Sequence, residues 1–406
     1  MSTTDIAGTV GTAVITLTED DLDPYVTHAP TRRWLSGPGL PADGDLLSFD
    51  ALRTDGLRTV GDSMGDPDQL AAELRDRLVI GGILGADGRE TDSVLLDGAT
   101  GEISTTYFLH DRPDLMDTRP LAPSLEKLVR FATAADELAA LRGQFASYAG
   151  RLGPQAVAEA SRQLLALFEE GTDGDPGPFW KMTAVIRPLS LVAGPGTTSG
   201  LALDLPPRLL DEAFGPGRIA RFEEVDFPST LTHEPTRRFL RETGLPEDGY
   251  WFSLDTDVPL PTLAEYEAIC ATEREDGITA AHLPAGADRL IRLGHLLEDT
   301  SLLIDGTTGA VLCWSEPDTT LRPLNADVST LAFTLWLINR EKSLATIHAL
   351  TDAYDQLAET MSRTLATADP IACDPTPSTP SDDGWRYWPG VFGDEARKQA
   401  ADMIKA

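Results

Sequence analysis

The chain has 406 residues, of which 41% are hydrophobic, and its 65 acidic against 33 basic side chains give a net charge of −32. This charge argues against nucleic acid as a partner, because phosphate recognition rests on clustered lysine and arginine. It favours a basic protein partner, since opposite fields raise the rate of encounter. An acidic surface that only keeps the protein soluble is the alternative.

Neither a membrane segment nor an export signal is expected. No apolar run reaches the roughly 18 residues that a membrane helix needs. The first 21 residues lack the basic start and long apolar stretch of a secretory signal, so we expect a cytoplasmic protein without membrane contact. Its three cysteines, Cys270, Cys313 and Cys373, lie far apart and predict neither a disulfide framework nor a metal site.

The first half of the chain predicts strands followed by helices. A short strand at 13–17 precedes a short helix that begins near Thr27 and ends near Gly39, and another strand follows at 46–50. Three apolar runs at hairpin spacing then predict an antiparallel meander, 78–84, 93–97 and 102–107. Helices are predicted afterwards, at 124–151 and 155–170.

The second half repeats this order after a glycine- and proline-rich segment, 191–207, which we interpret as a flexible linker. A helix capped by Thr232 and stopped near Gly244 is predicted between the first two strands. A longer helical region, 326–368, follows the meander. The strands are predicted at 218–222, 250–255, 290–297, 301–305 and 310–315.

The two halves are copies of one unit. Residues 27–50 (THAPTRRWLSGPGLPADGDLLSFD) return as residues 232–255 (THEPTRRFLRETGLPEDGYWFSLD), with 14 of 24 positions identical. A period near 205 residues is domain-sized, so each copy should carry its own core. Because strands come before helices in each copy, we predict two tandem α+β domains, 1–190 and 207–406, each an antiparallel or mixed sheet covered by helices.

No catalytic or cofactor motif emerges from the sequence. His233-Glu234-Pro235 resembles the start of a zinc site, but position 237 is arginine, and no second histidine or C-x-x-C follows at a suitable distance. The glycines of 194–200 lack the Gly-Lys-Ser/Thr of a phosphate loop. We therefore expect no metal, no cofactor and no enzyme activity.

A histidine beside paired arginines recurs in both copies. Such a set could clamp a phosphate or carboxylate. A histidine at a helix start or turn, with arginines lying along the surface, is the interpretation we favour. Together with turn and cap residues, the set forms a fold signature: His28, Arg32, Arg33, Gly39 and Pro41 in the first copy, and His233, Arg237, Arg238, Gly244, Pro246, Asp305, Gly306 and Gly309 in the second.

The chain resembles the SUKH (SMI1/KNR-like) superfamily of bacterial immunity proteins, and most closely its fourth family, and its two copies together carry the resemblance over nearly the whole length. The resemblance rests on the Thr-Arg-Arg-Phe-Leu helix at 236–240, Gly-Leu-Pro at 244–246, the turn at 303–309, and Asn325 before the long helix. The first copy keeps most of these features but has Pro123-Ser124 near the place of Asn325, so its resemblance is weaker. The resemblance implies α+β domains without catalytic residues that bind and neutralise polymorphic toxins, several of which are nucleases or nucleic-acid deaminases.

The resemblance implies a cognate toxin domain as the partner, and the charge indicates a basic one. Two alternatives stay open: a regulatory scaffold of the same fold with a cellular partner, and a small-ligand or phosphate-binding protein that uses the histidine and arginine cluster. Which copy binds, and the oligomeric state, stay open as well. We expect the partner-binding residues at a strand start and a hairpin tip of the second copy: Glu247, Asp248, Tyr250, Trp251, Glu298 and Asp299.

Overall fold

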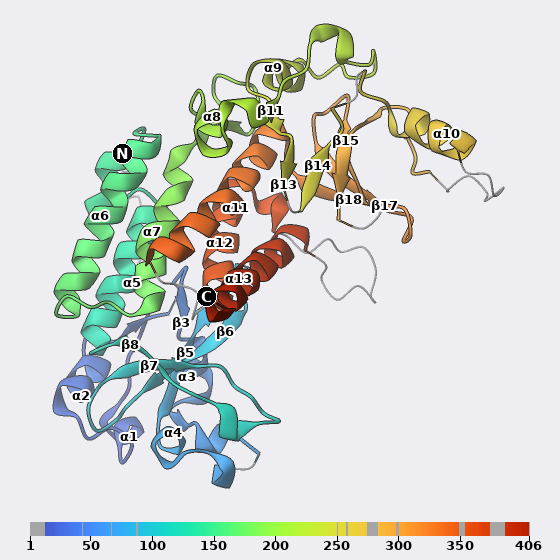
Figure 1. Cartoon of the computed structure of the whole chain (residues 1–406). Helices are drawn as coiled ribbons and strands as arrows, with labels where there is room; N and C mark the ends of the chain where they lie inside the picture. The colour runs from blue at the N-terminus through green and yellow to red at the C-terminus, as the bar shows by residue number, and fades with distance from the viewer. Residues whose placement is uncertain are drawn as a thin grey trace, which may run out of the picture. The chain divides into compact units, whose positions relative to one another are not determined.

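The computed structural model (Figure 1) forms two compact units, and each is described by itself. One unit comprises Met1–Ala149 and Ala160–Ala184, and the other comprises Gly150–Glu159 and Val185–Ala406. Within them, the structure describes residues 13–42, 44–65, 67–86, 88–249, 251–256, 259–273, 283–297, 300–348, 354–373 and 386–405.

The first unit opens with a small hairpin-like pair. β1 (Val14–Ile15) pairs with β2 (Leu40–Pro41), and between them lie α1 (Glu19–Leu22) and α2 (Ala29–Ser36). The expected strand at 13–17 is therefore only two residues long. α2 has His28 as its N-cap, one residue later than the expected Thr27.

The predicted meander of the first unit is confirmed as an antiparallel sheet. The strands lie in the order β3-β5-β6-β7-β8, and β4 also pairs with β5. One face of this sheet carries an apolar cluster that includes Leu95 and Met116. The strands are β3 (Leu47–Ser48), β4 (Arg58–Thr59), β5 (Leu78–Leu84), β6 (Glu90–Leu96), β7 (Ile103–Thr106) and β8 (Arg119–Ala122).

Aromatic side chains join the later helices of the first unit to its sheet. The rings of Phe131, Phe168 and Trp180 meet at centroid distances of 5.0 to 5.2 Å, a spacing that favours aromatic packing. The indole Nε1 of Trp180 donates to the carbonyl of Leu121 in β8 at 2.7 Å. The helices are α3 (Asp50–Asp55), α4 (Ala72–Arg75) and α5 (Leu125–Ala139), together with α6 (Pro154–Gly171) and α7 (Pro178–Ile186), of which residues 160–184 belong to this unit.

The segment expected as a flexible linker is partly a hairpin. β9 (Gly194–Pro195) pairs with β10 (Leu203–Asp204), and the carboxylate of Asp204 accepts the backbone N–H groups of Thr197, Thr198 and Ser199 at 2.8 to 3.0 Å. These bonds satisfy the backbone amides of a turn within the segment that its composition had predicted to be a flexible linker.

The sheet of the second unit repeats that of the first. It is antiparallel throughout, in the order β13-β14-β15-β16-β17-β18, and a separate pair joins β11 to β12. Leu303 faces Leu312 here just as Leu95 faces Ser104 in the first unit. The strands are β11 (Ile219–Ala220), β12 (Leu245–Pro246), β13 (Asp248–Gly249), β14 (Phe252–Leu254), β15 (Leu290–Leu296), β16 (Thr300–Asp305), β17 (Val311–Ser315) and β18 (Thr320–Asn325).

Three long helices of the second unit lie side by side in Figure 1, coloured orange to red. They are α11 (Val328–His348), α12 (Tyr354–Ala368) and α13 (Tyr387–Lys405). Asn325 lies beneath them in a buried network, because its Nδ2 donates to Asp369 and Thr334 while its Oδ1 accepts from Trp388. The remaining α-helices are α8 (Leu209–Phe214), α9 (Glu234–Glu242) and α10 (Leu263–Glu273).

Short 3-10 helices complete the described secondary structure. In the first unit they are Gly61–Ser63, Pro67–Gln69, Pro113–Leu115 and Gly143–Tyr148. The last of these lies within the segment that was expected to continue α5, which instead ends at Ala139. In the second unit they are Arg187–Val192, Pro216–Arg218, Glu224–Asp226 and Pro370–Ala372.

Candidate functional site

The repeated Thr-His pair joins a helix start to a sheet turn in each copy. In the second copy the backbone N–H groups of Thr232 and His233 donate to the carbonyl of Gly306 at 2.8 and 3.0 Å. In the first copy the equivalent pair donates to Gly98 at 2.8 and 2.9 Å. α9 begins after His233, so the cap expected at Thr232 lies one residue further along the chain. The repeated residues thus fix helix to turn within their own unit.

Both histidine rings are held in the same way. Nδ1 of His233 lies 2.8 Å from Oγ1 of Thr236, and the corresponding distance from His28 to Thr31 is also 2.8 Å. Each ring lies against a glycine of the turn. A Cβ added to Gly309 would lie 2.3 Å from Nδ1 of His233, and the φ angle of Gly309 is +79°. Glycine is therefore required there for space and for backbone conformation.

The first arginine of each pair is engaged locally. Arg237 donates to the carbonyl of Leu231, pairs with Glu224 and lies over the ring of Phe227. Arg32 likewise donates to the carbonyl of Val26 and pairs with Glu19 and Asp23. The second arginines, Arg33 and Arg238, are exposed.

The other fold-signature residues also serve turns and short strands. Asp305 accepts the N–H groups of Thr307 and Thr308 at 2.9 and 3.0 Å, which forms the turn against which the Thr-His pair docks. Gly39 and Gly244 have φ angles of +73° and +75° after α2 and α9. Pro41 and Pro246 lie in the paired strands β2 and β12.

The predicted partner-binding residues divide into three groups. Glu247 and Asp248 are exposed, and Asp248 forms an ion pair with Arg218. Trp251 is only 7% exposed, and its indole donates to Glu395 of α13, so the exposure expected for it is wrong. Helix α13 covers this tryptophan from far along the chain. Tyr250, Glu298 and Asp299 lie outside the described residues.

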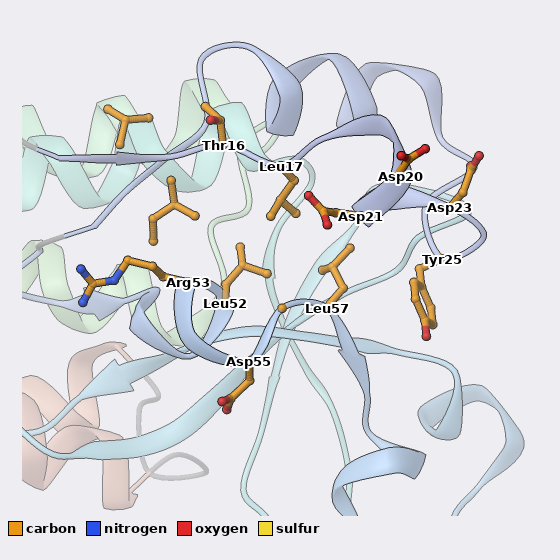
Figure 2. Close-up of a pocket in the computed structure, with 13 residues that line it drawn as sticks. Thr16, Leu17, Asp20, Asp21, Asp23, Tyr25, Leu52, Arg53, Asp55 and Leu57 are labelled. Atoms are coloured by element: carbon orange, nitrogen blue, oxygen red, sulfur yellow. The ribbon is translucent and has the colours of Figure 1, made fainter.

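An acidic groove, here called the Asp20 groove, opens on the first unit (Figure 2). Its volume is about 620 Å³. Figure 2 shows Asp20, Asp21 and Asp23 close together at one side of it. The sequence signal was the acidic run at 19–23, whose role in a groove was not anticipated. The lining residues are Val14, Ile15, Thr16, Leu17, Asp20, Asp21, Asp23, Tyr25, Leu52, Arg53, Asp55, Gly56 and Leu57.

Several carboxylates of the Asp20 groove already have local partners. Asp21 accepts from the side chain and backbone of Thr18, and these hydrogen bonds hold the pKa of Asp21 below its usual value. Asp23 pairs with Arg32 and Asp55 with Arg58. Only Asp20 among the four groove aspartates lacks an ion pair or side-chain hydrogen bond to another described residue. The groove is acidic, but most of its charge also holds local structure.

Comparison with known proteins decides the family. The family model described as SUKH-4 immunity protein matches residues 2–184 and 205–394. The chain belongs to the SUKH-4 immunity protein family. One match falls on each copy, so this member of SUKH-4 is a tandem duplication. No curated protein and no solved structure gives a significant match.

Two further findings concern the described part of this SUKH-4 chain. Its described residues contain no group of three or more histidine, cysteine, aspartate or glutamate side chains placed to hold a metal ion. Among the same residues, no helix combines the length and apolar character needed to cross a bilayer.

Proposed function

We propose that the protein neutralises a toxin domain by binding it directly, in the cytoplasm, without any catalytic step. The observation that carries this proposal is the match of both halves to the SUKH-4 immunity protein family. An immunity protein needs a surface that is complementary to its toxin. Protein recognition of this kind requires exposed and shaped surface more than reactive side chains.

The charge of the chain supports a basic toxin. A net charge of −32 raises the encounter rate with a positive partner and strengthens its attraction at low salt. Nuclease and deaminase domains that bind nucleic acid carry clustered lysine and arginine, to which an acidic inhibitor is complementary. The Asp20 groove and the exposed carboxylates of Glu247 and Asp248 are surfaces on which such residues could dock.

The contacts of the histidine and arginine cluster argue against a role of that cluster in binding a phosphate. His233 faces Thr236, while Arg237 is committed to Glu224 and to a backbone carbonyl. A phosphate clamp would need these donors to be free. Their local partners support a structural role in each copy and direct the search for the interface to other surfaces.

The test is a binding and inhibition experiment with the full chain. The purified protein is titrated into the toxin domain encoded beside its gene, and residual toxin activity and complex formation are measured together. Loss of toxin activity in step with complex formation is the expected result. A toxin that stays fully active in excess protein would refute the proposal, and an affinity unchanged by salt would remove its electrostatic part.

A further inference from the structure

A second hollow of the first unit, here called the β8 pocket, has no role in the contacts described so far. It has a volume of about 370 Å³ and lies where the edge strand β8 meets the loop between α6 and α7. Its lining combines an apolar wall with carboxylate and hydroxyl groups. The lining residues are Arg77, Glu102, Ile103, Ser104, Thr118, Pro120, Leu121, Ala122, Pro123, Thr172, Asp173, Asp175 and Gly177.

The duplicated chain provides an internal comparison for this pocket. Ser104 faces Leu95 across the strand pair, and in the second copy Leu312 faces Leu303. Leu312 packs against the apolar cluster of Leu303 and Trp314, whereas serine at the same place has two fewer side-chain heavy atoms and three fewer carbons. The first copy therefore lacks apolar volume where the second copy has it.

The hydroxyl of Ser104 is buried and unsatisfied. Ser104 is 7% exposed, and its Oγ has no hydrogen-bond partner within the described part of the chain. A buried hydroxyl without a partner costs about 1–3 kcal/mol. Its retention at a position where the other copy has leucine is explained if a bound group supplies the missing partner.

A similar replacement places a carboxylate at the same pocket. Glu102 and Ala310 occupy equivalent positions, because their carbonyls accept the N–H groups of Asp97 and Asp305 at 2.9 Å in the two copies. Alanine in the second copy is thus glutamate in the first, two residues before Ser104 and in the lining of the same pocket.

The charges around the pocket leave two carboxylates uncompensated. Arg77 pairs with Asp97 at 3.3 Å, and Asp175 pairs with Lys181 at 2.9 Å. The carboxylates of Glu102 and Asp173 form no ion pair and no hydrogen bond with any other described residue. The pocket therefore combines free negative charge, a buried hydroxyl and an apolar wall.

We propose that the β8 pocket binds an arginine side chain of the partner toxin domain. The aliphatic stem would pack on the exposed rings of Pro120 and Pro123, and the guanidinium would bind Glu102 or Asp173 and donate to Ser104. Arginine fits better than lysine because its planar head is weakly hydrated, offers five donors and often anchors protein interfaces. This inference rests on the proposed function, since it assumes that a toxin domain is the partner.

The first test gives the first copy the residues of the second. S104L fills the pocket with the side chain that the second copy carries, and E102A removes the free charge in the same way. The full chain with either change should bind the toxin domain at least about tenfold more weakly. E73A is the matched control, because Glu73 is an exposed carboxylate of the same unit that lies outside both the β8 pocket and the Asp20 groove, and it should leave the affinity within about twofold.

Retained affinity in both S104L and E102A would overturn the proposal, and so would an equal loss in E73A, which would show that overall charge and not the β8 pocket sets the affinity. Should S104L fail to fold, E102A still decides, because Glu102 is exposed and its removal leaves the core intact.

The second test separates failure of the pocket from failure of the proposed function. The probe is N-acetyl-arginine methylamide, and its neutral isostere N-acetyl-citrulline methylamide is the control. The arginine probe should shift the amide NMR signals of Ser104 and Leu121 of the full chain, with affinity on the order of millimolar. Equal effects of both probes, or no effect of either, would refute arginine binding in the β8 pocket even if the toxin domain binds the protein. If the toxin domain itself does not bind, the proposed function fails whatever the probe shows.

Discussion

The indole Nε1 of Trp251 donates to Oε1 of Glu395 at 2.8 Å. Both residues are buried, and they link the start of β14 to helix α13 across 144 positions of sequence. Lys342 of α11 approaches the same carboxylate at 3.3 Å. Trp251 therefore holds the second unit together, although its place at a strand start had suggested a contact residue.

Replacing Trp251 with phenylalanine should lower stability and leave partner binding unchanged. W251F keeps most of the apolar surface but removes one hydrogen bond to a buried carboxylate, which contributes about 1.5–3 kcal/mol. Urea unfolding of the full chain measures the change. Y107F is the matched control, because Tyr107 is 62% exposed and should tolerate the change. Weaker toxin binding without a change in unfolding would show that Trp251 acts at the interface.

Replacing Glu341 with glutamine should stabilise the protein at neutral pH. Glu341 is fully buried, and neither carboxyl oxygen has a hydrogen-bond partner among the described residues. Burial, together with the charge of Glu395, raises the pKa of Glu341 well above its usual value. The folded protein therefore keeps a proton that the unfolded chain releases above about pH 4.3. Stability falls as pH rises from there through the folded-state pKa.

The pH dependence of unfolding checks this account. The free energy of unfolding of wild type should decrease between about pH 5 and the raised folded-state pKa, and E341Q should lack that part of the slope. E247Q is the control, because Glu247 is exposed. Identical slopes for wild type and E341Q would contradict a buried protonated carboxyl.

Replacing Gly309 with alanine should strongly destabilise the second unit. Its positive φ angle and the ring of His233 at 2.3 Å from an added Cβ make alanine unfavourable on both counts. We expect a loss of about 2–3 kcal/mol by thermal or urea unfolding. G217A is the control, because a Cβ there would meet nothing within 4 Å. A G309A protein as stable as G217A would mean that the histidine does not pack on this turn.

Substitutions at His233 and Arg237 separate a structural role from a ligand clamp. H233N and R237Q remove the contacts to Thr236 and Glu224, and each should lower stability by about 1 kcal/mol. The affinity for the toxin domain should stay within about twofold of wild type. A loss of binding without a loss of stability would instead support the interpretation that the cluster binds a phosphate or carboxylate.

Local patterns predicted the meander because its determinants lie within a few residues of each other. Asp305 and Gly309 shape their own turn, so the turn can be read from one short stretch of sequence. The helix start at His233 was misplaced by one residue because threonine is the commoner cap.

The wrong predictions concern segments whose conformation or burial is set by residues far away in the sequence. Asp204 orders the glycine-rich 194–200 segment from its far end, and α13 buries Trp251 from more than a hundred residues away. The β8 pocket was visible only as a difference between the copies, serine against leucine, and this difference gains meaning once strand register places both residues at one position. Fold could therefore be inferred from what the copies share, whereas the candidate pocket required the three-dimensional arrangement.

The most direct measurement is a titration of the purified full chain into the toxin domain encoded beside its gene, with toxin activity and heat of binding recorded together at low and high salt. The account predicts a saturable complex whose formation abolishes toxin activity, and an affinity that falls as salt screens the attraction. A toxin domain that remains fully active and unbound at a large excess of the protein would contradict it.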